Sequence, residues 1–385
     1  MKKHFYLLTL LLFTLFLSAC SAFAAEPIKI GFVASLTGDY AAYGQAEANA
    51  AKMATDEINA KGGILGRKIE LITYDCRSRP EDTVNAVRRL IEKDKVVAIG
   101  GPNFSGAHIS ASPLVTKAKV PMVATFATNP LVTVDKGNVK PYNFRICFTD
   151  PYQGSLLAVL AAKDFKKMKG AVLYDVGSDY SQGLREYCVR DYEKQGGKIL
   201  KDLGFRAGDV DFRAQLTEIK NSGANVLFLP VMGKEGALIV KQAREMGMKD
   251  LLMMGGDGYG DFMHEIAGAA LVGTYWIQHV APDDPAIGHI LKDYEKIYKD
   301  ECKEYANATL AYDTVYWIAD AIKRTGKADG PAIAKALNDT KNLKLTHATI
   351  TIDPKTHTPM NKEGVALKVD KPGRVVFYKK VKPLD

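Results

Sequence analysis

Short apolar segments alternate with helical segments along this chain, and this alternation constrains its fold more than any other feature. The segment 28–33 is a run typical of a buried strand, whereas Val84, Val87 and Ile91 recur at helical spacing. Strands that alternate with helices predict a parallel sheet with right-handed crossovers. The predicted strands of this first part are residues 28–33, 69–74, 96–99 and 120–124.

The same alternation starts again after residues 145–148, so the chain contains two similar halves. The second half predicts helices at 153–167, 182–195, 212–221 and 234–246, and strands at 171–175, 198–205, 225–230, 251–255 and 272–277. The chain closes with helices at 285–298, 307–324 and 331–338, and with strands at 348–352, 365–369 and 375–379.

The length of the chain predicts two lobes, because about 360 residues exceed what one hydrophobic core usually supports. We predict an α/β fold with two Rossmann-like lobes, each with a parallel central sheet, joined by a three-strand hinge. The first lobe comprises residues 26–147 and 281–347, and the second comprises 148–280 and 348–385. With these boundaries the chain crosses three times between the lobes, and three such segments form a hinge about which the lobes close.

Residues 1–24 have the pattern of an export signal peptide, in which two lysines precede an apolar run at 5–17. This run is too short to span a membrane as a stable helix. The segment that ends at Cys20 resembles a bacterial lipobox, which predicts a lipid anchor, and residues 22–24 form an A-x-A site, which predicts a soluble protein. The short tether after Cys20 favours the soluble form. Both forms are periplasmic.

The cysteines of the mature chain are widely spaced, which fits neither a zinc site nor a C-x-x-C redox pair. An oxidising compartment permits disulfides. The sequence therefore leaves two alternatives, in which these cysteines are packed free thiols or form optional disulfides. They are Cys76, Cys147, Cys188 and Cys302.

Composition and motifs exclude several classes of function. Removal of the leader lowers the formal net charge from +8 to +6, and the absence of a basic stripe argues against nucleic-acid binding. The segment 255–260 fails the G-x-G-x-x-G spacing, and Ser105 does not lie in a G-x-S-x-G motif. His264 lacks the second histidine of H-E-x-x-H. We therefore expect no enzyme, no metal and no cofactor.

Two loops between residues 100 and 130 carry a hydroxyl group next to backbone N–H groups. They hold Ser105 and Thr128, and each follows a predicted strand. The carboxyl ends of parallel strands are where open α/β sheets bind ligands, so Ser105, the Phe126 N–H and Thr128 are expected to converge on a small anion. The alternative is that both hydroxyls only cap helices, which is the commoner role of such residues.

Short motifs occur in order through nearly all of the mature chain. They include Thr37-Gly38, Tyr43-Gly44, Gly62-Gly63, Gly100-Gly101-Pro102, Ala127-Thr128-Asn129-Pro130, Gln153-Gly154, Gly255-Gly256-Asp257 and Ala311-Tyr312-Asp313. In this order they resemble the periplasmic substrate-binding proteins of branched-chain amino acid ABC transporters, of periplasmic binding fold type I. The resemblance implies a monomeric receptor that binds an α-amino acid by hinge closure and transiently contacts a permease in the inner membrane.

The resemblance also implies the residues that bind each end of the ligand. Ser105, the backbone N–H of Phe126 and Thr128 would bind the α-carboxylate, and Asp257 and Tyr180 would bind the ammonium. A zwitterion needs neutral donors for its carboxylate and one negative acceptor for its ammonium, and this set supplies both. Because the two ends are held by different lobes, binding is expected to favour closure.

Several residues depart from the family pattern and leave the side chain of the ligand open. Asn103 and Phe104 stand where leucine-binding members have Leu and Cys, and Ser78 replaces the cysteine partner, so the family disulfide is absent. Phe126 replaces a small residue. The alternatives are an amide, an aromatic acid or another carboxylate as ligand, or a sensory role. The expected pocket residues are Tyr43, Asn103, Phe104, Ala127, Met232 and Tyr259.

Overall fold

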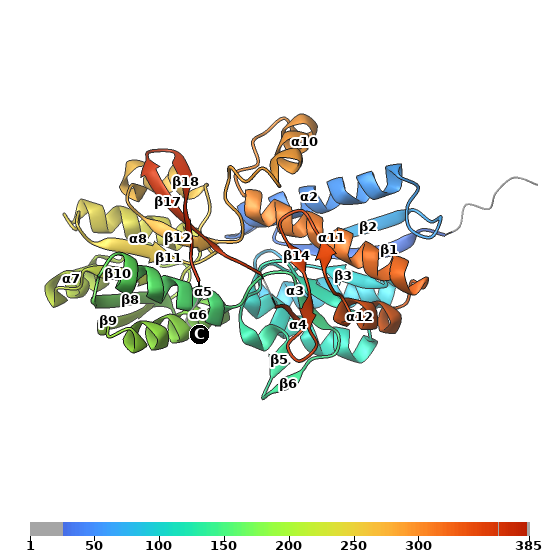
Figure 1. Ribbon diagram of the computed structural model, residues 1–385, viewed down its shortest axis with the longest axis horizontal. Helices are drawn as coiled ribbons and strands as arrows, with labels where there is room; N and C mark the ends of the chain where they lie inside the picture. The colour runs from blue at the N-terminus through green and yellow to red at the C-terminus, as the bar shows by residue number, and fades with distance from the viewer. Residues whose placement is uncertain (1–25, 361, 383–385) are drawn as a thin grey trace, which may run out of the picture.

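The computed structural model describes residues 26–360 and 362–382 and contains two α/β lobes that lie side by side (Figure 1). The predicted leader lies outside the described residues. The first lobe is built on a five-stranded sheet of order β2-β1-β3-β4-β7, in which all neighbouring strands are parallel. Its strands are β1 (Ile28–Ala34), β2 (Ile69–Asp75), β3 (Ala98–Gly100), β4 (Met122–Ala124) and β7 (Asn143–Arg145).

The second lobe repeats this strand order within a seven-stranded sheet, β18-β17-β12-β11-β10-β8-β9. The prediction of parallel central sheets is confirmed for its five strands from β8 to β12. The edge is antiparallel, because β17 and β18 are joined by a turn of two residues that reverses the chain. The strands are β8 (Lys169–Asp175), β9 (Lys198–Phe205), β10 (Val226–Leu229), β11 (Leu252–Gly255), β12 (Tyr275–Gln278), β17 (Val365–Lys371) and β18 (Arg374–Lys380).

Helices cover both sheets, and those of the first lobe come from two distant parts of the chain (Figure 1). The almost fully buried α11 packs along α2, which brings the late helices back onto the first lobe. The first-lobe helices are α2 (Ala41–Ala60), α3 (Pro80–Arg89), η1 (Leu90–Asp94), α4 (Ser105–Ala118), η2 (Pro130–Val132), α10 (Gly288–Tyr298), α11 (Tyr305–Thr325) and α12 (Gly330–Asn338). The second-lobe helices are α5 (Asp150–Val159), η3 (Leu160–Asp164), α6 (Asp179–Lys194), α7 (Arg213–Ser222), α8 (Gly233–Glu245), α9 (Met263–Ala267) and η4 (Gly268–Leu271).

Three segments of the chain run between the two sheets, after β7, after β12 and before β17. The rings of Phe148 and His279 stack with centroids 3.7 Å apart, so the first two segments lie against each other. The Lys362 ammonium donates a hydrogen bond of 2.8 Å to the Ile146 carbonyl, which ties the third segment to the first. The three segments therefore form one packed bundle.

The segment 348–359 differs from the prediction that placed it in the second lobe. The Ile352 N–H donates to the Thr340 carbonyl at 3.0 Å, and His357 Nδ1 lies 2.9 Å from the Asn143 carbonyl oxygen of β7. The sequence predicts one strand at 348–352, but the structure has two short strands there, and each pairs with a neighbouring strand in a small hairpin. These hairpins lie beside α12 on the first lobe. The small hairpins of the first lobe are β5 (Val134–Asp135) with β6 (Asn138–Val139), β13 (Leu343–Lys344) with β14 (Thr349–Ile350), and β15 (Ile352–Asp353) with β16 (Thr358–Pro359).

The four cysteines that the structure describes are free thiols, and all of them are buried. Ser78, at the position of the family's second cysteine, donates its hydroxyl proton to the Thr37 carbonyl at 2.9 Å and accepts the Tyr40 N–H. Within residues 26–360 and 362–382, no helix has the length and apolar character needed to cross a membrane.

Candidate ligand-binding site

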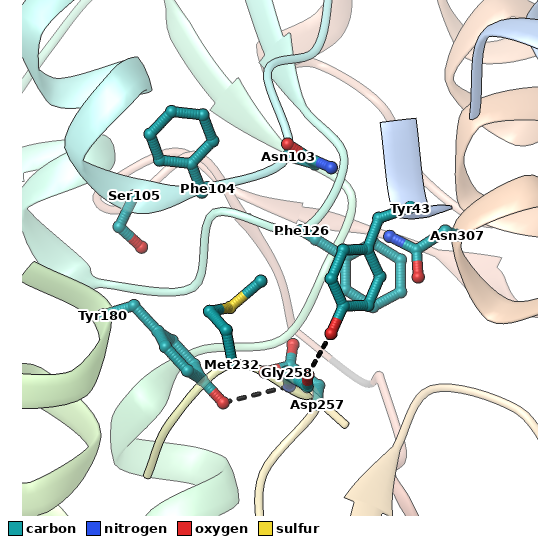
Figure 2. A pocket seen from close by; sticks show the side chains of 10 residues that line it. All are labelled: Tyr43, Asn103, Phe104, Ser105, Phe126, Tyr180, Met232, Asp257, Gly258 and Asn307. Carbon is teal, nitrogen blue, oxygen red and sulfur yellow. Dashed lines mark hydrogen bonds between the residues drawn. The ribbon is translucent and has the colours of Figure 1, made fainter. Parts of the chain in front are cut away.

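Loops at the carboxyl ends of strands in both sheets surround a cavity that is partly open to solvent and whose empty space, with its mouth, is about 320 Å³ (Figure 2). Parallel sheets of this strand order bind ligands at this edge, because loops from neighbouring strands diverge there. Eight of the eleven residues predicted from the sequence line the cavity, together with two that were not predicted. The lining residues are Tyr43, Asn103, Phe104, Ser105, Phe126, Tyr180, Met232, Asp257, Gly258 and Asn307.

Ser105 is the first residue of α4, where unpaired N–H groups and the helix dipole favour an anion. Its Oγ accepts the N–H of Asn129 at 3.2 Å. The hydroxyl proton is therefore available to a group in the cavity. Gly101, with φ of 78°, brings this loop so near β1 that a Cβ there would lie 2.1 Å from the Val33 carbonyl oxygen.

The turn that carries Phe126 is held in place by Arg145, which is completely buried. The guanidinium donates to the carbonyl of Ala127 at 2.9 Å, to the carbonyl of Asn129 at 2.7 Å and to the hydroxyl of Thr133 at 3.1 Å. Because these bonds fix successive carbonyl groups, the backbone around Phe126 is rigid before a ligand arrives.

On the opposite side of the cavity, the Asp257 carboxylate is held by three side chains of the second lobe. Gln153 donates its Nε2 to Oδ1 at 3.0 Å and accepts the Asp257 N–H on Oε1, also at 3.0 Å. His279 Nε2 lies 3.1 Å from Oδ2. The Tyr180 hydroxyl accepts the Gly258 N–H at 3.0 Å and bonds to the carboxylate (Figure 2). The carboxylate is thus fixed in position.

Burial, and secondly the nearby Asp150 carboxylate, raise the pKa of Asp257 to about 8. Burial lowers the pKa of His279 well below its usual value, so the imidazole is neutral and does not balance a negative charge. No lysine or arginine lines the cavity within the described part of the chain. A cationic group of a ligand would therefore supply the positive charge that the cavity does not place beside this carboxylate.

Tyr43 of α2 connects the two lobes across the cavity. Its hydroxyl donates to the Gly258 carbonyl at 2.5 Å and accepts the Gly233 N–H at 3.0 Å, and both of these residues belong to the second lobe. At the rim, the Asn129 side chain donates to the Asp179 carbonyl at 2.7 Å. The lobes are therefore closed on each other in this structure.

Three predicted residues lie elsewhere. The Tyr259 ring is completely buried in the second lobe, 5.9 Å from the ring of Trp276, because the backbone turns it inward after Gly258. Ala127 contributes its carbonyl to Arg145 and does not face the cavity. The Thr128 hydroxyl bonds to the Asp150 carboxylate and lies 3.4 Å from Gln153 Nε2.

Four residues of the site were not predicted from the sequence. Gln153 and His279 hold Asp257, and Gly258 and Asn307 line the cavity. Two of them could have been found from the sequence: Gln153 lies in the Gln153-Gly154 motif, and Gly258 follows Asp257 directly. Asn307 lies in the first turn of α11, and only the packing of α11 on α2 brings it to the site. Within the described residues, no group of His, Cys, Asp and Glu side chains is arranged to hold a metal ion.

Two hinged α/β lobes that close on a cavity between the carboxyl ends of their strands define a two-lobed binding protein. The chain belongs to the periplasmic binding protein family, whose model matches residues 27–373. This is a family of binding proteins, and its members work outside the cytoplasm.

The chain is 31% identical to Leu/Ile/Val-binding protein homolog 3 of Brucella melitensis, over 85% of this chain and 88% of that protein. Among solved structures, it resembles a leucine binding protein from Thermotoga maritima, with 32% identity and a TM-score of 0.85, over 92% of this chain and 99% of that one. It also resembles the branched-chain amino acid transporter substrate binding protein LivJ of Streptococcus pneumoniae in complex with isoleucine, with 32% identity and a TM-score of 0.83 over the same shares.

Proposed function

We propose that this protein is the periplasmic receptor of an ABC importer and that it binds an α-amino acid between its lobes. One observation carries the proposal: one cavity between the lobes has a helix N-terminus with a free hydroxyl proton on one lobe and, on the other, a buried carboxyl group with no cationic side chain lining the cavity. The names of the similar proteins, which include Leu/Ile/Val-binding and leucine binding proteins, support the same class of ligand.

The proposed roles follow from which groups remain unpaired. Ser105 donates its hydroxyl proton, and Phe126 its backbone N–H, to the ligand carboxylate. Asp257 accepts hydrogen bonds from the ligand ammonium, and Tyr180 positions that carboxylate. Thr128 is a third donor to the ligand carboxylate when its hydroxyl leaves Asp150, beside which it lies.

Closure is the step that binding controls. The first lobe holds the carboxylate donors and the second lobe holds the ammonium acceptor, so only the closed form contacts both ends of an amino acid. The ligand therefore binds the closed form more tightly and shifts the population toward it. A permease that recognises the closed form would receive a loaded monomeric receptor.

Calorimetry against the twenty amino acids, on protein stripped of ligand by partial unfolding, tests the proposal. Ser105→Ala is expected to weaken binding of the best ligand by about 10- to 100-fold, and Asp257→Asn by about thirtyfold or more, because each removes a buried charge-assisted bond. Ser110→Ala on the exposed face of α4 and Asp250→Asn on the surface are the matched controls. If no amino acid binds the parent protein, the proposal is wrong.

A further inference from the structure

Two asparagine side chains line the cavity away from the groups assigned to the ligand head. Asn307 lies on the opposite side of the cavity from Ser105 and Tyr180 (Figure 2). Asn103, in the loop after β3, lies between Phe104 and Tyr43 in the same view. Asn307 and Asn103 are 3% and 5% exposed, respectively. Buried amides of this kind need hydrogen-bond partners, so their orientation indicates what the cavity is built to hold.

The orientation of Asn307 is fixed from behind by a buried carboxyl group. Its Nδ2 donates to Glu47 Oε1 at 2.9 Å, and the Thr125 hydroxyl donates to the same oxygen at 3.1 Å. Glu47 is completely buried on α2, so it cannot follow the ligand. The amide oxygen of Asn307 is consequently turned away from Glu47, and it has no hydrogen-bond donor within the described part of the chain. It is an acceptor that faces the cavity.

Asn103 supplies the complementary group. Its Oδ1 accepts the Ser35 hydroxyl at 3.5 Å, and Ser35 is itself completely buried. Its Nδ2 donates to no acceptor among the residues that the structure describes. The side-chain end of the cavity therefore has one unpaired donor and one unpaired acceptor, beside the rings of Tyr43 and Phe126 (Figure 2).

An aliphatic ligand side chain would cover both amide groups and leave them without partners, which is costly in a closed cavity. An uncharged side chain that both donates and accepts a hydrogen bond would pair with them. An anionic side chain would lie in a cavity that already contains the Asp257 carboxylate. Sites built to hydrogen-bond a ligand group reject the analogue that lacks it much more strongly than apolar sites reject an added group.

We propose that Asn103 and Asn307 select an α-amino acid whose side chain carries a carboxamide or a hydroxyl group, in preference to an aliphatic one of the same shape. Asn307 accepts the proton of this group, Asn103 donates to its oxygen, and Glu47 positions Asn307. The inference rests on the proposed function, because it assumes that the ligand head occupies Ser105 and Asp257.

Two shape-matched pairs of ligands test this inference on the parent protein by calorimetry. Threonine is compared with valine and asparagine with leucine, which separates a hydroxyl from a carboxamide as the preferred group. In at least one pair the polar member is expected to bind at least about tenfold more tightly. Tighter or equal binding of valine and leucine would overturn the inference and leave the proposed function intact. If no amino acid binds, the proposed function itself is wrong.

Asn307→Leu then tests whether these side chains cause the preference. The variant is expected to bind the aliphatic member as tightly as the parent or more tightly, and to lose the preference for the polar member. Asn103→Leu provides the same test if Asn307→Leu does not fold, as judged by its circular dichroism. Asn221→Leu on the exposed surface of α7 is the control and is expected to keep the preference. An unchanged preference in both pocket variants would contradict the assignment.

Discussion

At the scale of single residues, the site is notable for a carboxyl group that the folded protein does not neutralise with a cation. Asp257 is 3% exposed, and its neighbours Gln153 and Tyr180 are neutral hydrogen-bonding groups. Burial of such a group without a counter-ion opposes ionisation. In this closed form, burial therefore favours the protonated form of Asp257.

This state predicts a pH-dependent affinity. The pKa of Asp257 is raised to about 8 in this closed form, and a ligand ammonium beside it would lower the pKa, so binding at pH 7 is expected to release a proton. Affinity is expected to rise between pH 6 and pH 8, by at most about tenfold per pH unit, and then to level off. Three other groups interact with the same carboxyl group: Asp150, whose pKa burial raises to about 7, Lys362, whose pKa burial lowers to about 7, and the Tyr180 hydroxyl. His279 beside it is neutral.

Calorimetry in buffers with different ionisation enthalpies measures the released proton directly. Asp257→Asn is the control, since it removes the titrating group and is expected to flatten the pH profile. A dissociation constant that is constant from pH 6 to pH 8.5, with no proton released, would contradict the assignment of Asp257 to the ligand ammonium.

At the scale of elements, helix α2 does more than cover the first sheet. It places Tyr43 across the cavity, where the hydroxyl bonds to Gly258 and Gly233 of the second lobe. The same helix carries Glu47 behind Asn307. One helix therefore both contacts the opposite lobe and shapes the side-chain end of the cavity.

Tyr43→Phe is expected to weaken the binding of every ligand by about 5- to 50-fold, because it removes two buried bonds that exist only in the closed form. The loss should be similar for polar and aliphatic ligands, unlike that of Asn307→Leu. Small-angle scattering at saturating ligand is expected to show the same compact form as the parent. Lys234→Gln is the control, since it removes only an exposed cross-lobe ion pair with Asp39 and should change affinity less than threefold. An affinity within twofold of the parent would show that Tyr43 does not stabilise closure.

At the scale of the whole molecule, three backbone segments and the packing around them join the two lobes, and the cysteines that the structure describes are free thiols. Cys147 lies in the first crossing segment, and burial raises the pKa of its thiol to about 12. Buried thiols of high pKa react slowly with oxidants and thiol reagents. Among the described residues, no disulfide therefore restricts the hinge.

This state predicts that stability does not depend on the redox potential. A disulfide contributes about 2–4 kcal/mol, so reduction of one would lower the melting temperature by several degrees. Protein expressed from residue 25 onward is expected to melt at the same temperature with and without reductant. Its four thiols should resist a thiol reagent in the native state and react after denaturation. A lower melting temperature in reductant would show that two of these cysteines pair in solution.

The sequence by itself determined the strand and helix alternation, the two lobes and most residues of the cavity. Apolar periodicity marks each element, and Ser105 and Phe126 follow strands that must be neighbours in a parallel sheet, whereas Tyr180 and Asp257 came from the family resemblance. The motifs around Gly100 and Gly255 are likewise short segments that can be recognised without knowledge of the tertiary structure.

The tertiary structure alone decided which polar groups remain unpaired. It turned Tyr259 into the core, kept 348–359 on the first lobe, and brought Asn307 and Glu47 together from positions 260 residues apart. Such contacts depend on how helices pack on a sheet, and a pattern of period 3.6 fixes the buried face of a helix without naming its neighbour. The resemblance therefore predicted the residues proposed for the ligand head, whereas the position of Asn307 beside them was set by the packing of α11 on α2.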